Sequence, residues 1–183
     1  AKAEPGAAIA MREYEALRLG GTVSDPLAPI RKLVEQQPKD AAALFALAQA
    51  AQEMGDRPTA IKTYQQLDTL RPNNPAVLNN LAWLKYEERD AGAVALAKRA
   101  HYAAPQDPRI TDTYGWLLVE GGKVKEGLAL LASIATGTAD EQYRMHYAQA
   151  LARAGRKAEA RDLSEKLTGS ASAGISDAAR KLV

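Results

Sequence analysis

The stretch from Asp107 to Gly122 reads DPRITDTYGWLLVEGG and carries the signals that determine the fold. It begins with Asp followed by Pro, which is typical of a helix N-terminus, because the Asp side chain accepts hydrogen bonds from free N–H groups of the first turn. It ends at two glycines, where a helix is expected to stop. Inside it, Tyr114 stands beside Gly115, a large residue next to the smallest one. The stretch therefore predicts a helix that packs closely against a second helix.

The same pattern recurs along the chain at intervals of 34, 33 and 33 residues. Each unit has a capping residue, a large residue beside a small one, a break, and a second helix with a small residue where it crosses the first. The caps are Asp40, Asn74, Asp107 and Asp140; the pairs are Leu47-Ala48, Leu81-Ala82, Tyr114-Gly115 and Tyr147-Ala148; the small residues of the second helices are Ala60, Ala93, Gly127 and Ala160. Such units predict an all-α fold, a right-handed α-solenoid of antiparallel helix pairs. They resemble the tetratricopeptide repeat, whose period and small residues they match.

The caps and breaks predict where the units begin and end. A degenerate helix pair is expected before the first full unit, with Asp25 as a further cap followed by Pro26. The predicted divisions are a disordered end (1–6), the degenerate pair (7–38), four units (41–74, 75–107, 108–140 and 141–168), a flexible linker (169–175) and a C-terminal capping helix (176–183).

The composition agrees with this fold and excludes several classes of protein. Of 183 residues, 38 are Ala and only 5% are aromatic, which argues against an all-β fold. The absence of Cys excludes disulfides and thiolate zinc sites. A net charge of +2 with interspersed signs argues against nucleic acid as a partner. The sequence contains no apolar run long enough to predict a membrane span.

The sequence also lacks the residue patterns of an enzyme or a metal site. His101 and His146 lie in different units, and no HExxH, GxSxG or phosphate-binding glycine loop occurs. Structural roles are the expected ones for both histidines. A hydrolytic site using His146 with Asp112 or Glu120 is the alternative, and we expect no such activity. The sequence predicts a protein that is not an enzyme and has no cofactor.

Function is expected on the concave surface, because a solenoid binds its partners there. In tetratricopeptide arrays the first helix of each pair lines that surface, and places two, five, nine and twelve after each cap point toward it. The predicted partner-binding groove consists of Phe45, Gln49, Asn79, Asn80, Trp83, Tyr86, Arg109, Asp112, Trp116, Glu120, Met145 and Gln149. Trp83 and Trp116 occupy the same place in neighbouring units. They either form a rigid contact surface or pack into the core between repeats, and the sequence leaves both open.

One known class of groove ligand is disfavoured by the pattern. Tetratricopeptide domains that bind chaperones hold a C-terminal carboxylate with Lys, Asn and Arg at set places. The corresponding places here are Phe45, Gln49, Asn80, Arg109 and Thr113. Only Asn80 and Arg109 fit, which argues against a heat-shock cochaperone.

A more specific resemblance is carried by three stretches, VLNNLAWL (77–84), ITDTYGWLLVE (110–120) and YRMHYAQALA (143–152). They are similar to the C-terminal repeats of tetratricopeptide lipoproteins of the PEP-CTERM/exosortase system, which are associated with exopolysaccharide gene clusters. Tyr114 and Met145 depart from that pattern. The resemblance implies a C-terminal piece of a longer, periplasmic protein tethered to the outer membrane.

The resemblance implies an interaction scaffold in exopolysaccharide synthesis, export or protein sorting. Its partner would be a protein or a peptide segment. The alternatives are a module that binds polysaccharide directly through the Trp-lined groove, and an adaptor for a protease or secretion system.

Overall fold

The computed structural model describes residues 5–21, 24–137 and 140–183, and the secondary structure of these residues consists of eleven α-helices and no strand. The predicted all-α fold is confirmed. The helices are α1 (Pro5–Gly20), α2 (Ala28–Gln36), α3 (Ala41–Glu53), α4 (Arg57–Leu70), α5 (Pro75–Glu87), α6 (Ala93–Ala103), α7 (Pro108–Glu120), α8 (Val124–Gly137), α9 (Glu141–Arg153), α10 (Lys157–Glu165) and α11 (Ala173–Arg180).

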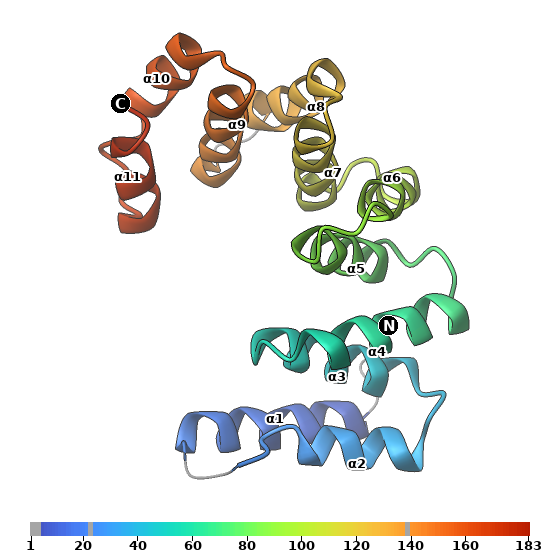
Figure 1. Cartoon of the computed structure of the whole chain (residues 1–183). Coiled ribbons are helices and arrows are strands. Elements are labelled where there is room, and N and C mark those ends of the chain that lie inside the picture. Colours follow the sequence, from blue (N-terminus) through green and yellow to red (C-terminus); the bar gives the residue numbers. More distant parts are fainter. Residues whose placement is uncertain (1–4, 22–23, 138–139) are drawn as a thin grey trace.

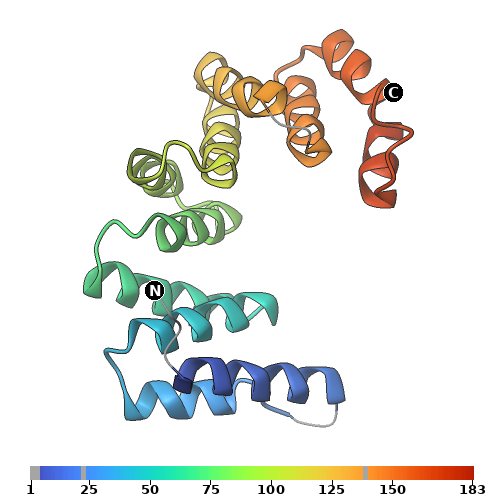
Figure 2. The same ribbon diagram turned by 180° about the vertical axis from the view of Figure 1, so that it is seen from behind.

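Consecutive helices form antiparallel pairs that stack into a curved array (Figure 1). Packing is most extensive within the pairs α3–α4, α5–α6, α7–α8 and α9–α10. The first helices of neighbouring pairs also touch, as in α5 with α7 and α7 with α9. Seen from either side, α5, α7 and α9 form the inner layer of the curve, and α6 and α8 form the outer layer (Figures 1 and 2). This arrangement leaves the inner layer open as a concave surface.

The four predicted caps all act as caps. The side chain of Asp40 accepts hydrogen bonds from the backbone N–H groups of Ala42 and Ala43, at 2.8 and 3.3 Å. The equivalent side chains of Asn74, Asp107 and Asp140 likewise accept from the first turns of α5, α7 and α9. Each cap satisfies N–H groups that have no partner inside the helix, which sets the start of each first helix.

Asp25 lies two residues before the N-cap position of α2 and does not cap the helix as predicted. The α-helix begins at Ala28, and the residue before it, Leu27, supplies no side-chain cap. The Asp25 carboxylate instead accepts from the Leu27 N–H at 3.2 Å and pairs with Arg31 at 3.0 Å. The expected cap therefore holds a turn that leads into α2.

The breaks between paired helices share one backbone conformation. A residue with positive φ stands at each of the four equivalent positions, and glycine adopts this left-handed conformation at least cost. The four residues are Gly55 (φ 76°), Arg89 (φ 59°), Gly122 (φ 84°) and Gly155 (φ 78°). The predicted breaks are thus where the chain reverses direction.

α7 and α8 cross at very close range, at Gly115 and Gly127. A β-carbon placed on Gly127 would lie 2.5 Å from the carbonyl oxygen of Gly115 and 2.7 Å from Cγ2 of Val119. The small residues at the other crossings, Ala60, Ala93 and Ala160, are buried as the pattern predicts. Small side chains at the crossings therefore set the distance between the paired helices.

The two ends of the chain differ from the predicted divisions. Residues 5 and 6, expected in a disordered end, belong to α1, and residues 1–4 lie outside the described residues. The last helix begins at Ala173 and ends at Arg180, so the predicted linker is shorter and the helix does not reach residue 183. Hydrogen bonds hold this linker: Ser176 Oγ donates to the Thr168 carbonyl at 2.6 Å, and the Ser176 N–H donates to the Ser172 carbonyl at 2.9 Å. The Ser172 N–H donates in turn to Ser170 Oγ at 3.1 Å, so hydrogen bonds order the turn that leads into α11.

Candidate functional site

Five of the twelve predicted groove residues line one hollow of about 500 Å³, which lies between α3, α5 and the start of α7. Aromatic, amide and guanidinium groups meet there. The predicted residues that line it are Phe45, Gln49, Asn79, Asn80 and Arg109. Pro75, Ala76, Asp107 and Ile110 complete its walls. The hollow therefore combines an apolar ring with groups that can hydrogen-bond to a peptide backbone.

Asn80 is held in place by Tyr64, a buried tyrosine of α4 that lies outside the predicted groove places. Asn80 Nδ2 donates to the Tyr64 hydroxyl at 2.9 Å, and that hydroxyl donates to Gln52 Oε1 at 3.2 Å. The Tyr64 ring lies edge-on to Phe45, with ring centroids 6.1 Å apart. Burial raises the pKa of Tyr64 to about 12, so the hydroxyl stays protonated. Through Tyr64, α4 thus contacts and orients two of the predicted groove residues, Phe45 and Asn80.

Arg109 stands at the other end of the hollow and already has an acidic partner. Its Nη2 atom lies 2.7 Å from Asp107 Oδ2. The Asp107 side chain also accepts from the Arg109 N–H, and the guanidinium holds the pKa of this carboxyl below its usual value. The Arg109 side chain is exposed, so a ligand can reach it, but its charge is partly balanced.

A second group of predicted residues forms a row across three first helices. The Trp83 and Tyr86 rings are 5.6 Å apart, and the Tyr86 hydroxyl donates to Glu120 Oε2 at 3.0 Å. Arg153 Nε on α9 lies 3.6 Å from Glu120 Oε1. The row joins α5, α7 and α9 along the concave surface and leaves Trp83 36% exposed.

The sequence left open whether Trp83 and Trp116 form a contact surface or pack into the core, and the two side chains differ in this respect. Trp83 is exposed, whereas Trp116 is half-buried and packs against the core clusters on both sides of α7. Within the described residues, the Trp116 Nε1 atom is buried without a hydrogen-bond partner. With Gln149 and Arg153, the Trp116 edge lines a hollow of about 480 Å³ that Leu182 of the C-terminal segment also reaches. Trp116 is therefore mainly a core residue and Trp83 mainly a surface residue.

Met145 does not lie on the concave surface. Its side chain is only 3% exposed, and it belongs to a cluster with Ala148, Leu167 and Ala179. Ala179 comes from α11, which packs against α9. The predicted groove place of Met145 is therefore buried against the C-terminal part of the chain.

Asp112 is also buried, and it forms a pair with His146 across the α7–α9 contact. His146 Nδ1 lies 2.6 Å from Asp112 Oδ2, and Asp112 is 9% exposed. This hydrogen bond raises the pKa of His146. The rings of His146 and Trp116 are 6.3 Å apart. The two residues of the pair are 34 positions apart, about one repeat period, so they lie on the first helices of neighbouring units.

His101 has a comparable contact between helices. Its Nδ1 atom lies 3.2 Å from the Thr111 hydroxyl, and its ring is 5.4 Å from that of Tyr114. Burial lowers the pKa of His101. Both histidines therefore join helices to one another, as expected for structural roles.

We expect the His146–Asp112 pair to stabilise the protein more at about pH 5.5 than at about pH 8. The pKa of His146 is raised in the folded state, so the contribution is complete below the unfolded value of 6.5 and is lost as the pH rises through the folded value. Thermal melting of wild type and Asp112→Asn across this range checks it. The difference in melting temperature should shrink as the pH rises. A constant difference would contradict the assignment.

His101→Gln is the control. The pKa of His101 is lowered in the folded state, so this residue favours folding more at higher pH, and the difference in melting temperature between wild type and His101→Gln should grow as the pH rises.

The described part of the chain contains no group of three or more His, Cys, Asp and Glu side chains placed to hold a metal ion. Of its helices, none combines the length and the apolar character that crossing a membrane requires.

Comparisons with known proteins agree with this architecture. Residues 42–74 match the family model of the tetratricopeptide repeat. No curated protein sequence matches the chain. A thermophilic tetratricopeptide-repeat protein of Thermus thermophilus has a similar structure, with a TM-score of 0.75 and 17% identity over 96% of this chain and 98% of that one.

Two further solved structures are similar over nearly their whole length. PilW, a type IV pilus biogenesis factor, has a TM-score of 0.76 and 17% identity, over 98% of this chain and 91% of its own. YrrB, a tetratricopeptide-repeat protein with an unusual peptide-binding site, has a TM-score of 0.69 and 15% identity, over 96% of this chain and 92% of its own. At these identities the similarity shows the fold. Residues 42–74 thus match a tetratricopeptide repeat, and the chain around them has the fold of a tetratricopeptide-repeat solenoid.

Proposed function

We propose that the chain is a non-enzymatic scaffold that binds an extended peptide segment of a partner protein on its concave surface. The hollow between α3, α5 and α7 carries this proposal. Phe45 offers an apolar contact there, and the exposed amide of Gln49 can donate to and accept from a peptide backbone. The peptide-binding site of YrrB, a protein of the same fold, supports the proposal.

The cellular setting is a further part of the proposal. The stretches at 77–84, 110–120 and 143–152 support a place among the PEP-CTERM/exosortase-associated proteins, in periplasmic or outer-membrane machinery for exopolysaccharide synthesis or export. Fractionation of the source cell with a tagged full-length protein tests the compartment. Recovery of the protein with the cytoplasm would contradict it.

Peptide binding on the concave surface can be tested by selecting binders from a phage-displayed library of random peptides. The selected peptides should lose about tenfold or more in affinity for the double variant Gln49→Ala/Trp83→Ala, because both side chains are exposed on first helices, α3 and α5, and alanine removes their contact area. Fluorescence anisotropy with the labelled peptides measures the dissociation constants.

The matched control is Tyr102→Ala, which removes a 71% exposed aromatic ring from α6 in the outer layer. Peptide binding should be unchanged in this variant. Equal losses in both variants, or the selection of no peptide at all, would contradict the proposal. Circular dichroism of each variant verifies that the fold is retained.

A further inference from the structure

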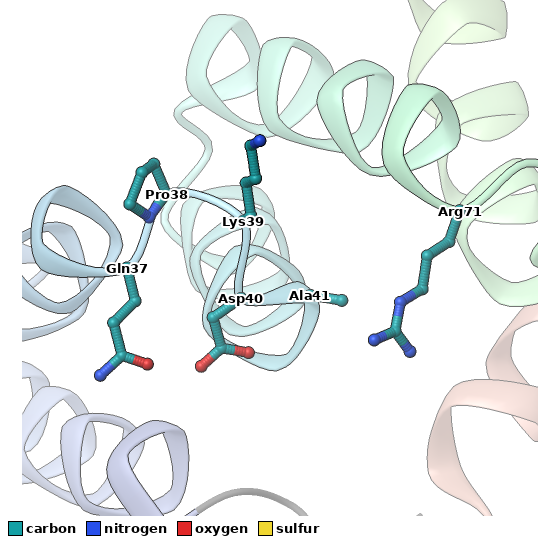
Figure 3. Close-up of a pocket in the computed structure, with 6 residues that line it drawn as sticks. All are labelled: Gln37, Pro38, Lys39, Asp40, Ala41 and Arg71. Carbon is teal, nitrogen blue, oxygen red and sulfur yellow. The ribbon is translucent and has the colours of Figure 1, made fainter.

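Three adjoining hollows lie along the N-terminal ends of α3 and α5. The first, of about 400 Å³, lies between residues 37–41 and Arg71 (Figure 3). The second, of about 290 Å³, shares Ala41 and Arg71 with the first. The third is the 500 Å³ hollow described above, which shares Phe45 and Ala76 with the second. Neighbouring hollows share lining residues and therefore adjoin one another, and the three together are here called the rim trough.

The middle of the rim trough is apolar. Its floor consists of Leu67 and Val77, which are 3% and 2% exposed, and the half-buried Phe45 forms one wall. Such a hollow can take an apolar side chain out of water, which is the main source of affinity at peptide-binding sites.

At one end of the trough, the charged side chains that have no partner are positive. Among the described residues, the side chains of Lys39 and Arg71 have no hydrogen bond or ion pair. The Asp40 carboxylate, by contrast, caps α3. Figure 3 shows Arg71 extending from the end of α4 toward Ala41, while the Lys39 and Asp40 side chains point away from each other. An arginine without a partner beside an apolar hollow favours a ligand that brings its own carboxylate.

We propose that the rim trough selects peptides in which an acidic residue stands next to a large apolar residue. The carboxylate pairs with Arg71, the apolar side chain fills the hollow over Leu67 and Val77, and the peptide backbone continues toward the amides of Gln49 and Asn79. This specificity rests on the proposed function, and it assigns to Arg71 a role outside the groove places that the repeat pattern indicates.

The test uses peptides selected from the random library on wild-type protein and, separately, on the variant Arg71→Glu. The wild-type pool should be enriched in an acidic residue adjacent to Leu, Ile, Met or Phe. The pool selected on Arg71→Glu should lose this acidic preference. The most enriched wild-type peptide should bind Arg71→Glu about tenfold or more weakly, since reversing the charge turns attraction into repulsion. Replacing its acidic residue with Lys should restore binding to the variant.

The matched control is Arg12→Glu, which reverses an exposed arginine on α1 that lines none of the three hollows. It should change affinity less than about twofold, and equal losses in both charge reversals would overturn the proposal by showing a general charge effect.

The two proposals fail in different ways. Peptides that lose affinity for Gln49→Ala/Trp83→Ala but bind Arg71→Glu as well as wild type would overturn the rim-trough proposal and leave peptide binding standing. A selection that yields no peptide sensitive to either change would overturn both.

Discussion

Gly127→Ala should destabilise the protein by about 3 kcal/mol, although replacing glycine with alanine within a helix is ordinarily stabilising. The reason is the crossing of α7 and α8, where the new β-carbon would lie 2.5 Å from the Gly115 carbonyl oxygen and 2.9 Å from the Val119 nitrogen. Both are backbone atoms, so no side chain can rotate away. The two helices must move apart and lose the packing of Leu131 at their interface.

Urea unfolding followed by tryptophan fluorescence measures this effect, since Trp116 lies on α7 itself. Gly137→Ala is the matched control in the same helix, because nothing lies within 4 Å of a β-carbon at that position. The control should leave the unfolding midpoint unchanged or raise it slightly. A Gly127→Ala midpoint equal to that of wild type would contradict the close approach of the two helices.

Trp116→Ala should cost about 3 kcal/mol of folding free energy, because removing a large aromatic side chain from between two core clusters leaves a cavity. The ring packs against the cluster that contains Leu117 and Leu118 and also against the one that contains Leu131 and Leu151. The first cluster is built from α5, α6 and α7 and the second from α7 to α10, so the ring joins the pair α7–α8 to the pairs on both of its sides. Its loss should loosen the C-terminal half of the solenoid first.

Trp83→Ala is the comparison, since Trp83 occupies the same place in the preceding unit and is 36% exposed. It should lose less than half as much stability as Trp116→Ala, as measured by urea unfolding with circular dichroism. Equal losses would show that both rings are core residues. The expected difference also means that binding experiments on the concave surface should use Trp83, because a Trp116 variant changes the fold as well as the surface.

The repeat register was predictable because its signals act locally. Asp40 caps the helix that follows it through N–H groups two and three residues away, and Gly55 and Gly122 adopt left-handed conformations that few other residues tolerate. Asp25 shows the limit of such signals. The same Asp-Pro pair holds a turn there, because the carboxylate bonds to Leu27 and Arg31 instead of a helix N-terminus.

The candidate site was only partly predictable, because helical spacing gives the direction of a side chain from its own helix and not what lies opposite. Met145 and Trp83 both stand at predicted groove places. Met145 is 3% exposed because α11 packs against it, whereas Trp83 is 36% exposed. Arg71, by contrast, is accessible but was not predicted, because it stands at the end of a second helix, outside the places that line the groove. It lies beside a hollow because α3, α4 and α5 stack there.

Local signals in the chain predict the helices, their pairing and their period, since caps, breaks and small crossing residues act over one unit of about 34 residues. Packing between units sets which side chains of the inner layer remain accessible. It placed Asp112 against His146, Trp116 between two cores and α11 over Met145. These outcomes depend on contacts between units, which form only when the pairs stack, and no local signal in the chain specifies them.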